Sequence, residues 1–337
     1  MPEFSIIIPV RNEARTLRAC LEALQGQTIA RKRFEIIVVD DGSSDDSPKI
    51  AGGCADRLIR LGKEGAAAAR NRGFAAATGS VIVFLDADCV PAPDWLERMT
   101  AFLVDPQIGG TVGRFVSDQR SWVARMVQLE LDRRYSRLER FRDIDFVNTA
   151  TCAFRREVLP DPPFDETFGK LEDLELSFRL AAAGVRMRYV ADAVVHHHHP
   201  ESIVSYALRR FRYGRFSTLL YRRYSSKIVA DSSTPHTRRL QLIFLGLAFP
   251  AILLSGWVSL ALLALSLLCS ASTIFAAARR SPGLALVSPL FVLSGNTAFV
   301  AGTALGLATS LLRRTPVRKP VKQLSEDSEP ANDTKLA

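Results

Sequence analysis

The sequence has few cysteines and lacks the short motifs that mark several large enzyme classes. Its five cysteines are scattered and form no CxxC pair, which is typical of a reducing compartment and argues against a structural zinc site. No GxGxxG follows a strand, and there is no Walker A sequence, no GxSxG and no inferable Ser-His-Asp arrangement. The missing glycine motif lowers the case for a dinucleotide-dependent oxidoreductase. No basic stretch precedes the first apolar run, so we expect no secretory signal and a polar part that stays in the cytoplasm.

Charged side chains are missing from two long stretches late in the chain. Residues 242–278 and 283–312 contain none, although charged residues make up 23% of the 337 residues. A lipid hydrocarbon core accepts such stretches, so we predict a soluble first part followed by a membrane region over 242–312 with about three spans. Within 242–278, a hairpin of two short spans with a turn near Ser255 fits better than one helix, which would be about 55 Å long.

The net charge of +9 is concentrated just before these apolar stretches. A helix predicted over 202–224 carries one apolar and one basic face, which is typical of a helix lying in a membrane interface. A core-facing helix with a solvated side is the alternative. The basic residues of this region are Arg209, Arg210, Arg212, Arg215, Arg222, Arg223, Lys227, Arg238 and Arg239. An anionic cytoplasmic leaflet attracts such a segment, and no nucleic-acid-binding motif accompanies it, so we expect membrane lipids and no nucleic acid as partners.

Apolar runs and helical patterns alternate through the first part of the chain. We predict buried strands over 4–10, 34–39, 58–61 and 80–85, separated by helices that include 12–24 and 64–77. This alternation is typical of a mostly parallel α/β sheet covered on both faces. Further along we predict helices over 122–141 and 171–183, an extended stretch over 145–154 and a strand over 187–195. Such sheets bind ligands at the carboxyl ends of their strands, where the polar clusters of this sequence lie.

Carboxylates follow two of the predicted strands. Asp86 and Asp88 come directly after the strand over 80–85. Hard oxygen ligands at a strand end suit Mg²⁺ or Mn²⁺, which usually share their coordination with substrate phosphates. Asp41 follows a neighbouring strand, where a carboxylate commonly binds a ribose hydroxyl or a base N–H. Helix capping is the alternative role of Asp41.

Three other groups of polar residues are candidates, each with a simple structural alternative. Arg70 follows an alanine-rich stretch and could bind phosphate, or belong to a solvated helix face. Glu172 and Asp173 open a helix, where either could act as a general base or only complement the helix dipole. His197 and His199 share one face of an extended segment and could approach a metal or a diphosphate, or lie in a solvated polar loop.

Six segments taken together resemble the family 2 glycosyltransferases, which are inverting enzymes of the GT-A fold. They occur in the family's order and spacing over nearly all of residues 1–225. The segments are SIIIPVRNE (5–13), EIIVVDDGSSDDS (35–47), GAAAARNRGFAAATGSVIVFLDADC (65–89), NTATCAFRREVL (148–159), FDETFGKLEDLELSFRLAAAG (164–184) and VVHHHHP (194–200). The most similar members are bacterial, membrane-associated and carry C-terminal transmembrane helices, often in polysaccharide or glycolipid assembly.

The resemblance implies a role for each matching residue. Asp173 would be the catalytic base with Glu172 beside it, and Asp88 would hold a metal ion that bridges the donor's two phosphates. Asn148 and Thr149 would lie near the acceptor. The residues that bind the nucleotide-sugar would be Pro9, Arg11, Glu13, Asp41, Arg70 and Asp86.

One feature of processive family members is missing. The sequence has no QxxRW motif, and a basic segment over 209–215 occupies the corresponding region. Arg212 or Arg215 could serve the diphosphate in its place. The absence favours the transfer of one sugar at a time over polymer synthesis.

These expectations combine into one scheme. The predicted parts are a GT-A domain over 1–225, made of a nucleotide-sugar-binding half (1–112), an acceptor and catalytic-base half (113–200) and an interfacial amphipathic helix (201–225), then a basic juxtamembrane linker (226–241), a transmembrane region (242–312) and a disordered tail (313–337). We predict a metal-dependent, inverting hexosyltransferase that uses Mg²⁺ or Mn²⁺, a UDP- or GDP-sugar and a lipid-linked or glycan acceptor. It would be a multi-pass protein of the cell (inner) membrane with a cytoplasmic catalytic domain. A non-catalytic nucleotide-sugar-binding membrane scaffold and a nucleotidyltransferase are the alternatives.

Overall fold

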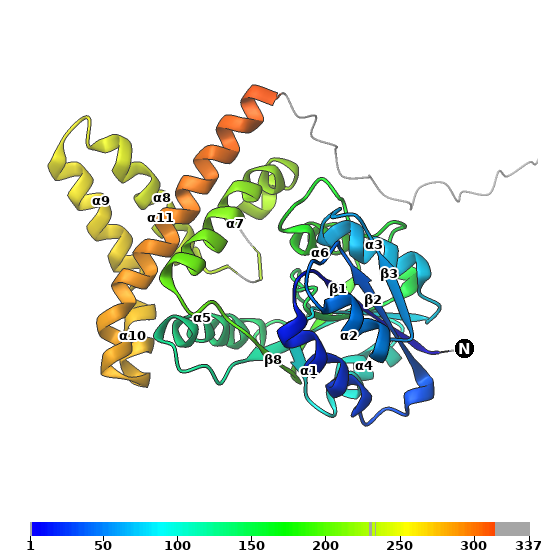
Figure 1. Cartoon of the computed structure of the whole chain (residues 1–337). Coiled ribbons are helices and arrows are strands. Elements are labelled where there is room, and N and C mark those ends of the chain that lie inside the picture. The colour runs from blue at the N-terminus through cyan, green and yellow to red at the C-terminus, as the bar shows by residue number, and fades with distance from the viewer. Residues whose placement is uncertain (1, 229–230, 233, 314–337) are drawn as a thin grey trace, which may run out of the picture.

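The computed structural model describes residues 2–228, 231–232 and 234–313, in a sheet domain and a group of helices beside it (Figure 1). The strands are β1 (Phe4–Val10), β2 (Phe34–Asp40), β3 (Arg57–Arg60), β4 (Val81–Leu85), β5 (Cys89–Pro91), β6 (Ile108–Val116), β7 (Thr151–Arg155) and β8 (Arg186–His197). The helices are α1 (Ala14–Gln25), α2 (Ser47–Cys54), α3 (Ala66–Ala76), α4 (Trp95–Ala101), α5 (Trp122–Leu138), α6 (Glu172–Ala182), α7 (Ile203–Arg223), α8 (His236–Ala251), α9 (Gly256–Cys269), α10 (Ala271–Arg280) and α11 (Pro282–Arg313).

The first half of the sheet has the predicted parallel arrangement. The strand order is β3-β2-β1-β4-β7-β6-β8-β5, and β3, β2, β1 and β4 run parallel to one another. β1 and β2 are apolar and almost completely buried, as the continuous β-branched runs predicted. Helix α3 approaches this sheet closely, since a Cβ added to Gly73 would lie 2.3 Å from Ile7 Cγ2. Its alanines and this glycine therefore bring Arg70 up to the sheet.

The second half of the sheet is mixed in direction. β7 is antiparallel to β4 and β6, and β5 is antiparallel to β8. Only the last part of the extended stretch predicted over 145–154 is a strand, since β7 begins at Thr151. β8 continues two residues beyond the predicted end, and its register places His197 opposite Cys89 of β5. This pairing brings the histidine run next to the Asp86–Asp88 loop.

The apolar region forms a helical hairpin and one long helix. α8 and α9 are joined by a turn over 252–255, which is the predicted turn position, and α8 already begins at His236, inside the predicted linker. Within the described part of the chain, α11 is the one helix that is long and apolar enough to cross a membrane. α9 and α10 pass the same test only together, as one span bent by 48°. Length and composition therefore support one or two crossings, and the prediction of about three stays a prediction. All but the first residue of the predicted disordered tail (313–337) lies outside the described residues.

Helix α7 is held on one side by α11, which runs along it (Figure 1). Glycines allow the two backbones to touch: a Cβ on Gly214 would lie 2.0 Å from Phe299 O, and one on Gly302 would lie 2.0 Å from Phe211 O. Small residues at such crossings are typical of closely packed helices in membranes. The glycine contacts therefore fix the position of α7 along α11.

The C-terminal end of α7 is tied to α6. Glu175 of α6 accepts hydrogen bonds from Tyr224 Oη at 3.0 Å and from Arg223 Nη1 at 3.2 Å, and Glu175 is 2% exposed. The apolar face predicted for α7 as an interfacial helix is exposed near the N-terminal end of the helix and buried near its C-terminal end. Val204 and Leu208 are exposed, whereas Leu220 is fully buried beside Phe168. α7 thus combines an exposed apolar edge with a face packed against the protein.

Candidate functional site

Polar loops from several elements meet at the carboxyl edge of the parallel strands. Asn12, after β1, donates its backbone N–H to Ser43 Oγ at 2.9 Å, and its Oδ1 accepts from Ser44 N at 2.8 Å. Three residues other than glycine adopt a left-handed backbone conformation among the described residues, and all lie in loops at this edge: Asn12, Lys63 and Leu171. Such strained conformations cluster at functional sites. The carboxyl edge of the parallel strands is therefore the candidate site.

Arg70 joins two parts of this edge that are distant in sequence. It is 4% exposed and donates from Nη2 to Asp86 Oδ1 at 2.7 Å and from Nη1 to Glu172 Oε1 at 2.8 Å. Burial alone would lower the pKa of Arg70, but Asp86 and Glu172 hold it above its ordinary value. The solvated helix face considered for Arg70 is wrong, because Arg70 is a buried bridge. It brings together the strand-end acids and the start of α6.

Asp173 lies next to this bridge, at the first turn of α6. Burial, and then the neighbouring carboxylate of Glu172, raise the pKa of Asp173 to about 6. The left-handed residue Leu171 (φ 69°) immediately precedes the pair and turns the chain into the helix. A carboxylate with this pKa is ionised at pH 7 and still basic enough to accept a proton, which suits a general base.

Asp88, Cys89 and His197 offer possible metal ligands within 4.8 Å of one another. Asp88 Oδ2 lies 3.5 Å from His197 Nε2, a separation that two ligands of one cation can have. Burial and the nearby Asp88 and Asp86 keep the pKa of Cys89 well above its ordinary value, so its thiol is protonated in the metal-free protein. A carboxylate oxygen suits both Mn²⁺ and Mg²⁺, whereas an imidazole nitrogen suits Mn²⁺ better, and positions are left for phosphate oxygens. The donor set thus fits the predicted cation.

The four consecutive histidines face four different partners. His196 Nδ1 lies 3.2 Å from Asp118 Oδ2, and His198 Nε2 lies 3.2 Å from Gln119 Nε2. His197 faces Asp88, while His199 lies behind it, with their Nδ1 atoms 3.0 Å apart. The predicted shared face of His197 and His199 is confirmed. Burial lowers the pKa of His197 to about 4 and that of His199 to about 3, so both rings are neutral at pH 7.

Asp41 makes the contacts of a backbone cap. Its carboxylate accepts from Glu64 N at 2.5 Å and Gly65 N at 3.0 Å, which holds the loop before α3. Glu13 lies close enough to Asp88 that burial, followed by the Asp88 charge, raises the pKa of Glu13. Pro9 is partly buried at the end of β1 and Arg11 is exposed just beyond it. These four predicted nucleotide-binding residues therefore lie on loops of the same edge.

The loop over 148–150 lies directly beside Asp86. Asn148 Oδ1 accepts from Ala150 N at 2.9 Å, and the backbone N–H of Asp86 donates to Ala150 O at 3.4 Å. Thr149 is 2% exposed. The structure thus brings the two predicted acceptor residues to the site, with Asn148 less buried than Thr149.

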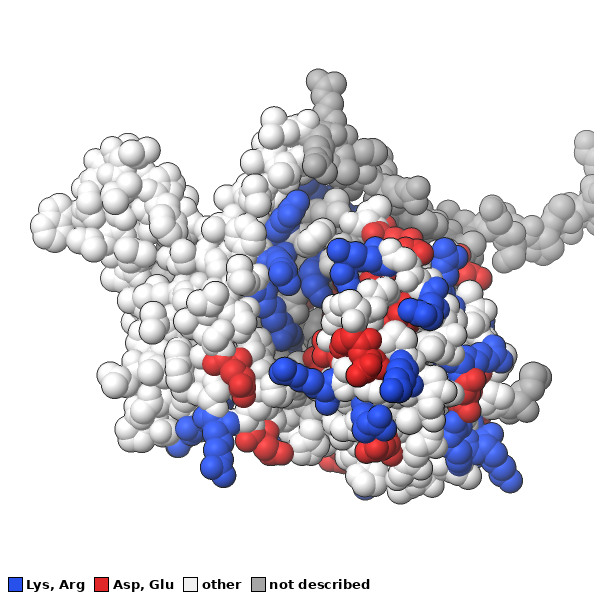
Figure 2. All heavy atoms as spheres, viewed as in Figure 1, with Lys and Arg blue, Asp and Glu red and all other residues white. Residues whose placement is uncertain are grey.

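The arginine that reaches the acids from α7 is one that the sequence analysis did not select. Burial and then the charge of Asp86 raise the pKa of Asp88 to about 6, and the charge of Arg209 offsets part of this rise. Burial and then the charge of Arg209 lower the pKa of His197. Arg209 Nε donates to Tyr213 Oη at 3.2 Å. The predicted Arg212 and Arg215 are exposed on the same helix. Figure 2 shows Lys and Arg side chains gathered in the hollow between this helical part and the sheet domain.

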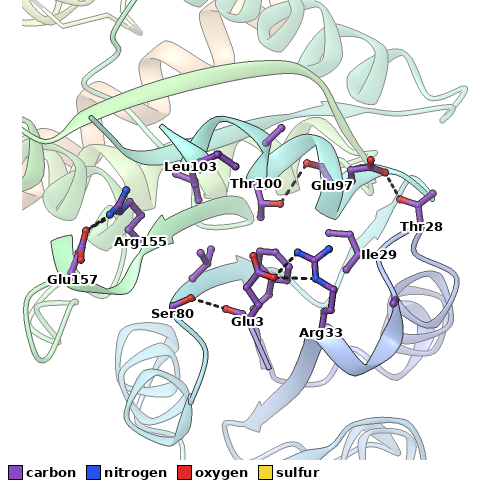
Figure 3. Close-up of a pocket in the computed structure, with 15 residues that line it drawn as sticks. Glu3, Thr28, Ile29, Arg33, Ser80, Glu97, Thr100, Leu103, Arg155 and Glu157 are labelled. Carbon is purple, nitrogen blue, oxygen red and sulfur yellow. Dashed lines mark hydrogen bonds and ion pairs between the residues drawn. The ribbon is translucent and has the colours of Figure 1, made fainter. Parts of the chain in front are cut away.

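A separate pocket lies at the other end of the sheet, near Glu3, Arg33, Ser80 and Glu97 (Figure 3). Its charged side chains pair with one another: Arg33 Nη2 lies 2.5 Å from Glu3 Oε2, and Thr28 Oγ1 donates to Glu97 Oε2 at 2.7 Å. The pocket is remote from the acids at the carboxyl edge. Its polar groups are satisfied internally, so it is not the candidate site.

Comparison with known proteins identifies the sheet domain. Residues 5–161 match the family described as Glycosyl transferase family 2. The chain is 33% identical over 236 residues to the Pre-mycofactocin glycosyltransferase of Mycobacterium tuberculosis, covering 67% of this chain and 49% of that protein. It is 40% identical over 104 residues to Glycosyltransferase AglE of Haloferax volcanii, covering 29% of this chain and 34% of the relative. The chain thus spans about half or less of the length of these relatives.

A solved structure supports the fold over most of the chain. The mannosyltransferase PcManGT from Pyrobaculum calidifontis, in complex with GDP-Man and Mn²⁺, matches with a TM-score of 0.60. The match covers 91% of this chain and 87% of that chain at 20% sequence identity. At this identity the likeness concerns the fold, which is the predicted GT-A-like α/β fold followed by C-terminal helices. Its sheet was predicted to be mostly parallel and is mixed, because β7 and β5 run antiparallel to their neighbours. Residues 5–161 therefore match a family 2 glycosyltransferase domain, and the chain has a GT-A-like fold.

Proposed function

Since residues 5–161 carry a family 2 glycosyltransferase domain, we propose that the chain is an inverting glycosyltransferase. It moves a sugar from a UDP- or GDP-sugar to a lipid-linked or glycan acceptor at the cytoplasmic face of a membrane, in polysaccharide or glycolipid synthesis. The Arg70 bridge between Asp86 and Glu172 carries the proposal. It joins Asp86 to Glu172, which supports a donor-side acid and a base-side acid acting at one site, as a single displacement requires.

Asp173 is the proposed base, with Glu172 beside it. It takes the proton from an acceptor hydroxyl as that oxygen attacks the anomeric carbon and the bond to the nucleoside diphosphate breaks. The position of Asn148 and Thr149 beside Asp86 supports their role near the acceptor. One displacement inverts the anomeric centre, and no second carboxylic acid has to protonate the leaving group.

The donor's nucleotide and diphosphate are proposed to bind across the strand ends. Pro9, Arg11, Glu13 and Asp41 line the nucleotide side, while Arg70 orients Asp86 toward the ribose or sugar. The carboxylate of Asp41 already accepts hydrogen bonds from Glu64 N and Gly65 N. Asp41 therefore contributes to the nucleotide side partly by fixing the shape of the loop before α3. This double role combines the two alternatives that the sequence left open.

Charge on the leaving diphosphate requires neutralising groups. Asp88 and His197 would hold Mg²⁺ or Mn²⁺, which when bound supplies a positive charge at the two phosphates. Arg209 adds a fixed positive charge at the same place, and Arg212 and Arg215 stay candidates for the outer part of the groove. Since α11 could cross a membrane, the exposed apolar edge of α7 supports an acceptor that reaches the site from a lipid surface.

A donor screen tests the proposal. Full-length protein in detergent is incubated with UDP- and GDP-sugars, with Mn²⁺, Mg²⁺ or chelator, with and without membrane lipid extract, and nucleoside diphosphate release is measured. We expect metal-dependent release from one donor, abolished in Asp173→Asn with donor binding retained. Asp118→Asn is the matched control, because Asp118 is 88% exposed and pairs with His196, which has no part in the proposed reaction. Full activity of Asp173→Asn would contradict the assignment.

Two other results would point to the alternatives. Release of pyrophosphate in place of nucleoside diphosphate would indicate a nucleotidyltransferase. Metal-dependent nucleotide binding without turnover, with every donor and with lipid extract present, would indicate a non-catalytic scaffold.

A further inference from the structure

The histidine run at the end of β8 is linked to α5 by a chain of hydrogen bonds that the proposed reaction does not use. His197 Nδ1 lies 3.0 Å from His199 Nδ1, and His199 Nε2 lies 2.9 Å from Gln128 Oε1. At the other end of the chain, His197 Nε2 lies 3.5 Å from Asp88 Oδ2. Gln128 is 9% exposed and His199 2%. A buried amide is therefore connected, through one histidine, to the proposed metal ligand.

Gln128 sets the direction of these hydrogen bonds. Its Nε2 group donates to Phe115 O at 3.0 Å and to Asp132 Oδ1 at 2.8 Å. Both partners are acceptors, so the opposite orientation of the amide would place three oxygens against one another. The carbonyl oxygen of Gln128 must therefore face His199.

The proton positions on both rings follow from this orientation. An amide oxygen only accepts, so His199 donates from Nε2, and its Nδ1 then carries the lone pair in the neutral ring. His199 Nδ1 accepts from His197 Nδ1, which therefore carries the proton of that ring. A histidine that binds a metal ion must be neutral, so the remaining nitrogen of His197, Nε2, is the one that offers its lone pair beside Asp88.

We propose that Gln128 and His199 are positioning residues that fix His197 in the Nδ1–H tautomer and present its Nε2 as a preformed ligand for a divalent cation shared with Asp88. The inference rests on the metal dependence in the proposed function. In this arrangement His199 orients the metal ligand His197 and is not itself a second metal ligand. Hydrogen bonding of the second ring nitrogen commonly fixes metal-binding histidines in this way.

The contact between His197 and Asp88 supports the same assignment. In this tautomer the lone pair of His197 Nε2 faces Asp88 Oδ2 at 3.5 Å, so both atoms are available to one cation. The hydrogen-bond chain from Gln128 thus presents a nitrogen and an oxygen to the same divalent cation.

The tautomer can be read directly in the metal-free protein. Full-length protein labelled with ¹⁵N-histidine is studied in detergent by long-range ¹H–¹⁵N correlation, and the His197 signals are assigned from their loss in His197→Gln. We expect the Nδ1–H form for His197 and the Nε2–H form for His199. The Nε2–H form of His197 would overturn the inference, even in a fully active enzyme.

Cation binding is the second measurement, with Mn²⁺ alone as the probe and its free concentration followed by electron paramagnetic resonance. Gln128→Leu removes the acceptor that sets the tautomer, and we expect Mn²⁺ affinity to fall about 10- to 100-fold. Gln119→Leu is the matched control: Gln119 binds the backbone of His199, donating from Nε2 to its O at 3.1 Å and accepting from its N at 2.6 Å. We expect little change in that variant.

The outcomes separate this inference from the proposed function. Equal loss of Mn²⁺ affinity in Gln128→Leu and Gln119→Leu would mean a merely structural role and would overturn it. If Gln128→Leu does not fold, the tautomer of the native protein decides. Native protein that binds no Mn²⁺ would overturn both this inference and the metal dependence. Sugar transfer with an Nε2–H His197 would overturn only this inference.

Discussion

Replacing Asp173 by asparagine should stabilise the fold while removing the proposed base. The pKa of Asp173 is raised from 3.8 to about 6 by burial and then by Glu172, so ionising this group costs free energy in the folded protein. The asparagine side chain has nearly the same shape and no charge. Its Oδ1 can still accept the hydrogen bond from Leu174 N, which measures 2.8 Å in the native protein. The variant therefore isolates the cost of the charge.

The size and pH range of the effect follow from the two pKa values. A raised pKa means that native stability declines as the pH rises from about 4 to about 6 and stays lowered above that range. The difference corresponds to at most about 3 kcal/mol at pH 8, and water at this partly buried side chain reduces it to about 1–3 kcal/mol. Near pH 4 we expect almost no difference. With about 2–4 °C per kcal/mol, the melting temperature of Asp173→Asn should rise by roughly 2–12 °C at pH 8.

Thermal unfolding in detergent, followed by tryptophan fluorescence at pH 4 and pH 8, measures this effect. Asp145→Asn is the control of opposite sign. Although burial alone would raise the pKa of Asp145, hydrogen bonds from Lys227 and Ser232 hold it below its ordinary value. That variant should lose stability at pH 8. A lower melting temperature of Asp173→Asn at pH 8, or an equal shift at both pH values, would refute the reasoning.

Three further results are expected. The rate of nucleoside diphosphate release should fall as the pH drops through about 6, where Asp173 gains a proton. A rate that stays unchanged down to pH 4 would exclude Asp173 as the base. Arg70→Ala leaves two carboxylates unpaired and should lower the free energy of unfolding by about 3–5 kcal/mol, against less than about 0.5 for Arg72→Ala, whose side chain is 61% exposed, in urea titrations. Gly302→Ala should loosen the α7–α11 contact and speed proteolysis after α7. Gly246→Ala should not, because a Cβ on Gly246 would lie 3.8 Å from the nearest atom, Val300 Cγ1.

The first half of the sheet was predictable because its strands carry their own signal. β1, β2 and β4 are continuous β-branched runs buried on both faces, and each ends in polar residues that parallel pairing must bring together. The stretch over 145–154 was harder, because residues 145–150 are irregular backbone ending in a turn, and the strand begins only at Thr151. A sequence pattern shows that a segment is extended but not whether it has a neighbour to pair with.

The site was predictable in its acids and less so in its partners. The roles of Asp86, Asp88 and Asp173 stay proposals. The position of Asp86 and Asp88 at this edge follows from the end of β4, whereas Asp173 is brought there by α6 and the Arg70 bridge. Arg209 was missed because a basic helix offers many arginines, and only the direction of each side chain separates them. The relation of His199 to His197 needed distances, since a shared face fits both a second ligand and an orienting group.

The number of membrane spans could not be read from hydropathy. An uncharged stretch gives a length, whereas the helix ends depend on local hydrogen bonding. The chain turns after Ala251 and bends by 48° near Ser270, so one apolar stretch is divided into pieces that are each too short to cross a bilayer. Hydropathy also did not show where α8 begins, because the helix starts at His236 with charged residues that precede the uncharged stretch.

The two-sided hold on α7 has a geometric consequence for the proposed enzyme. Glycine contacts fix α7 to α11 on one side, and Glu175 fixes its far end to α6, the helix that begins with Asp173. With α11 in a bilayer, the base would sit at a set height above the lipid surface and not on a flexible tether. A fixed distance between the base and the membrane would select acceptors by how far their hydroxyl lies from the lipid surface, as well as by their chemistry.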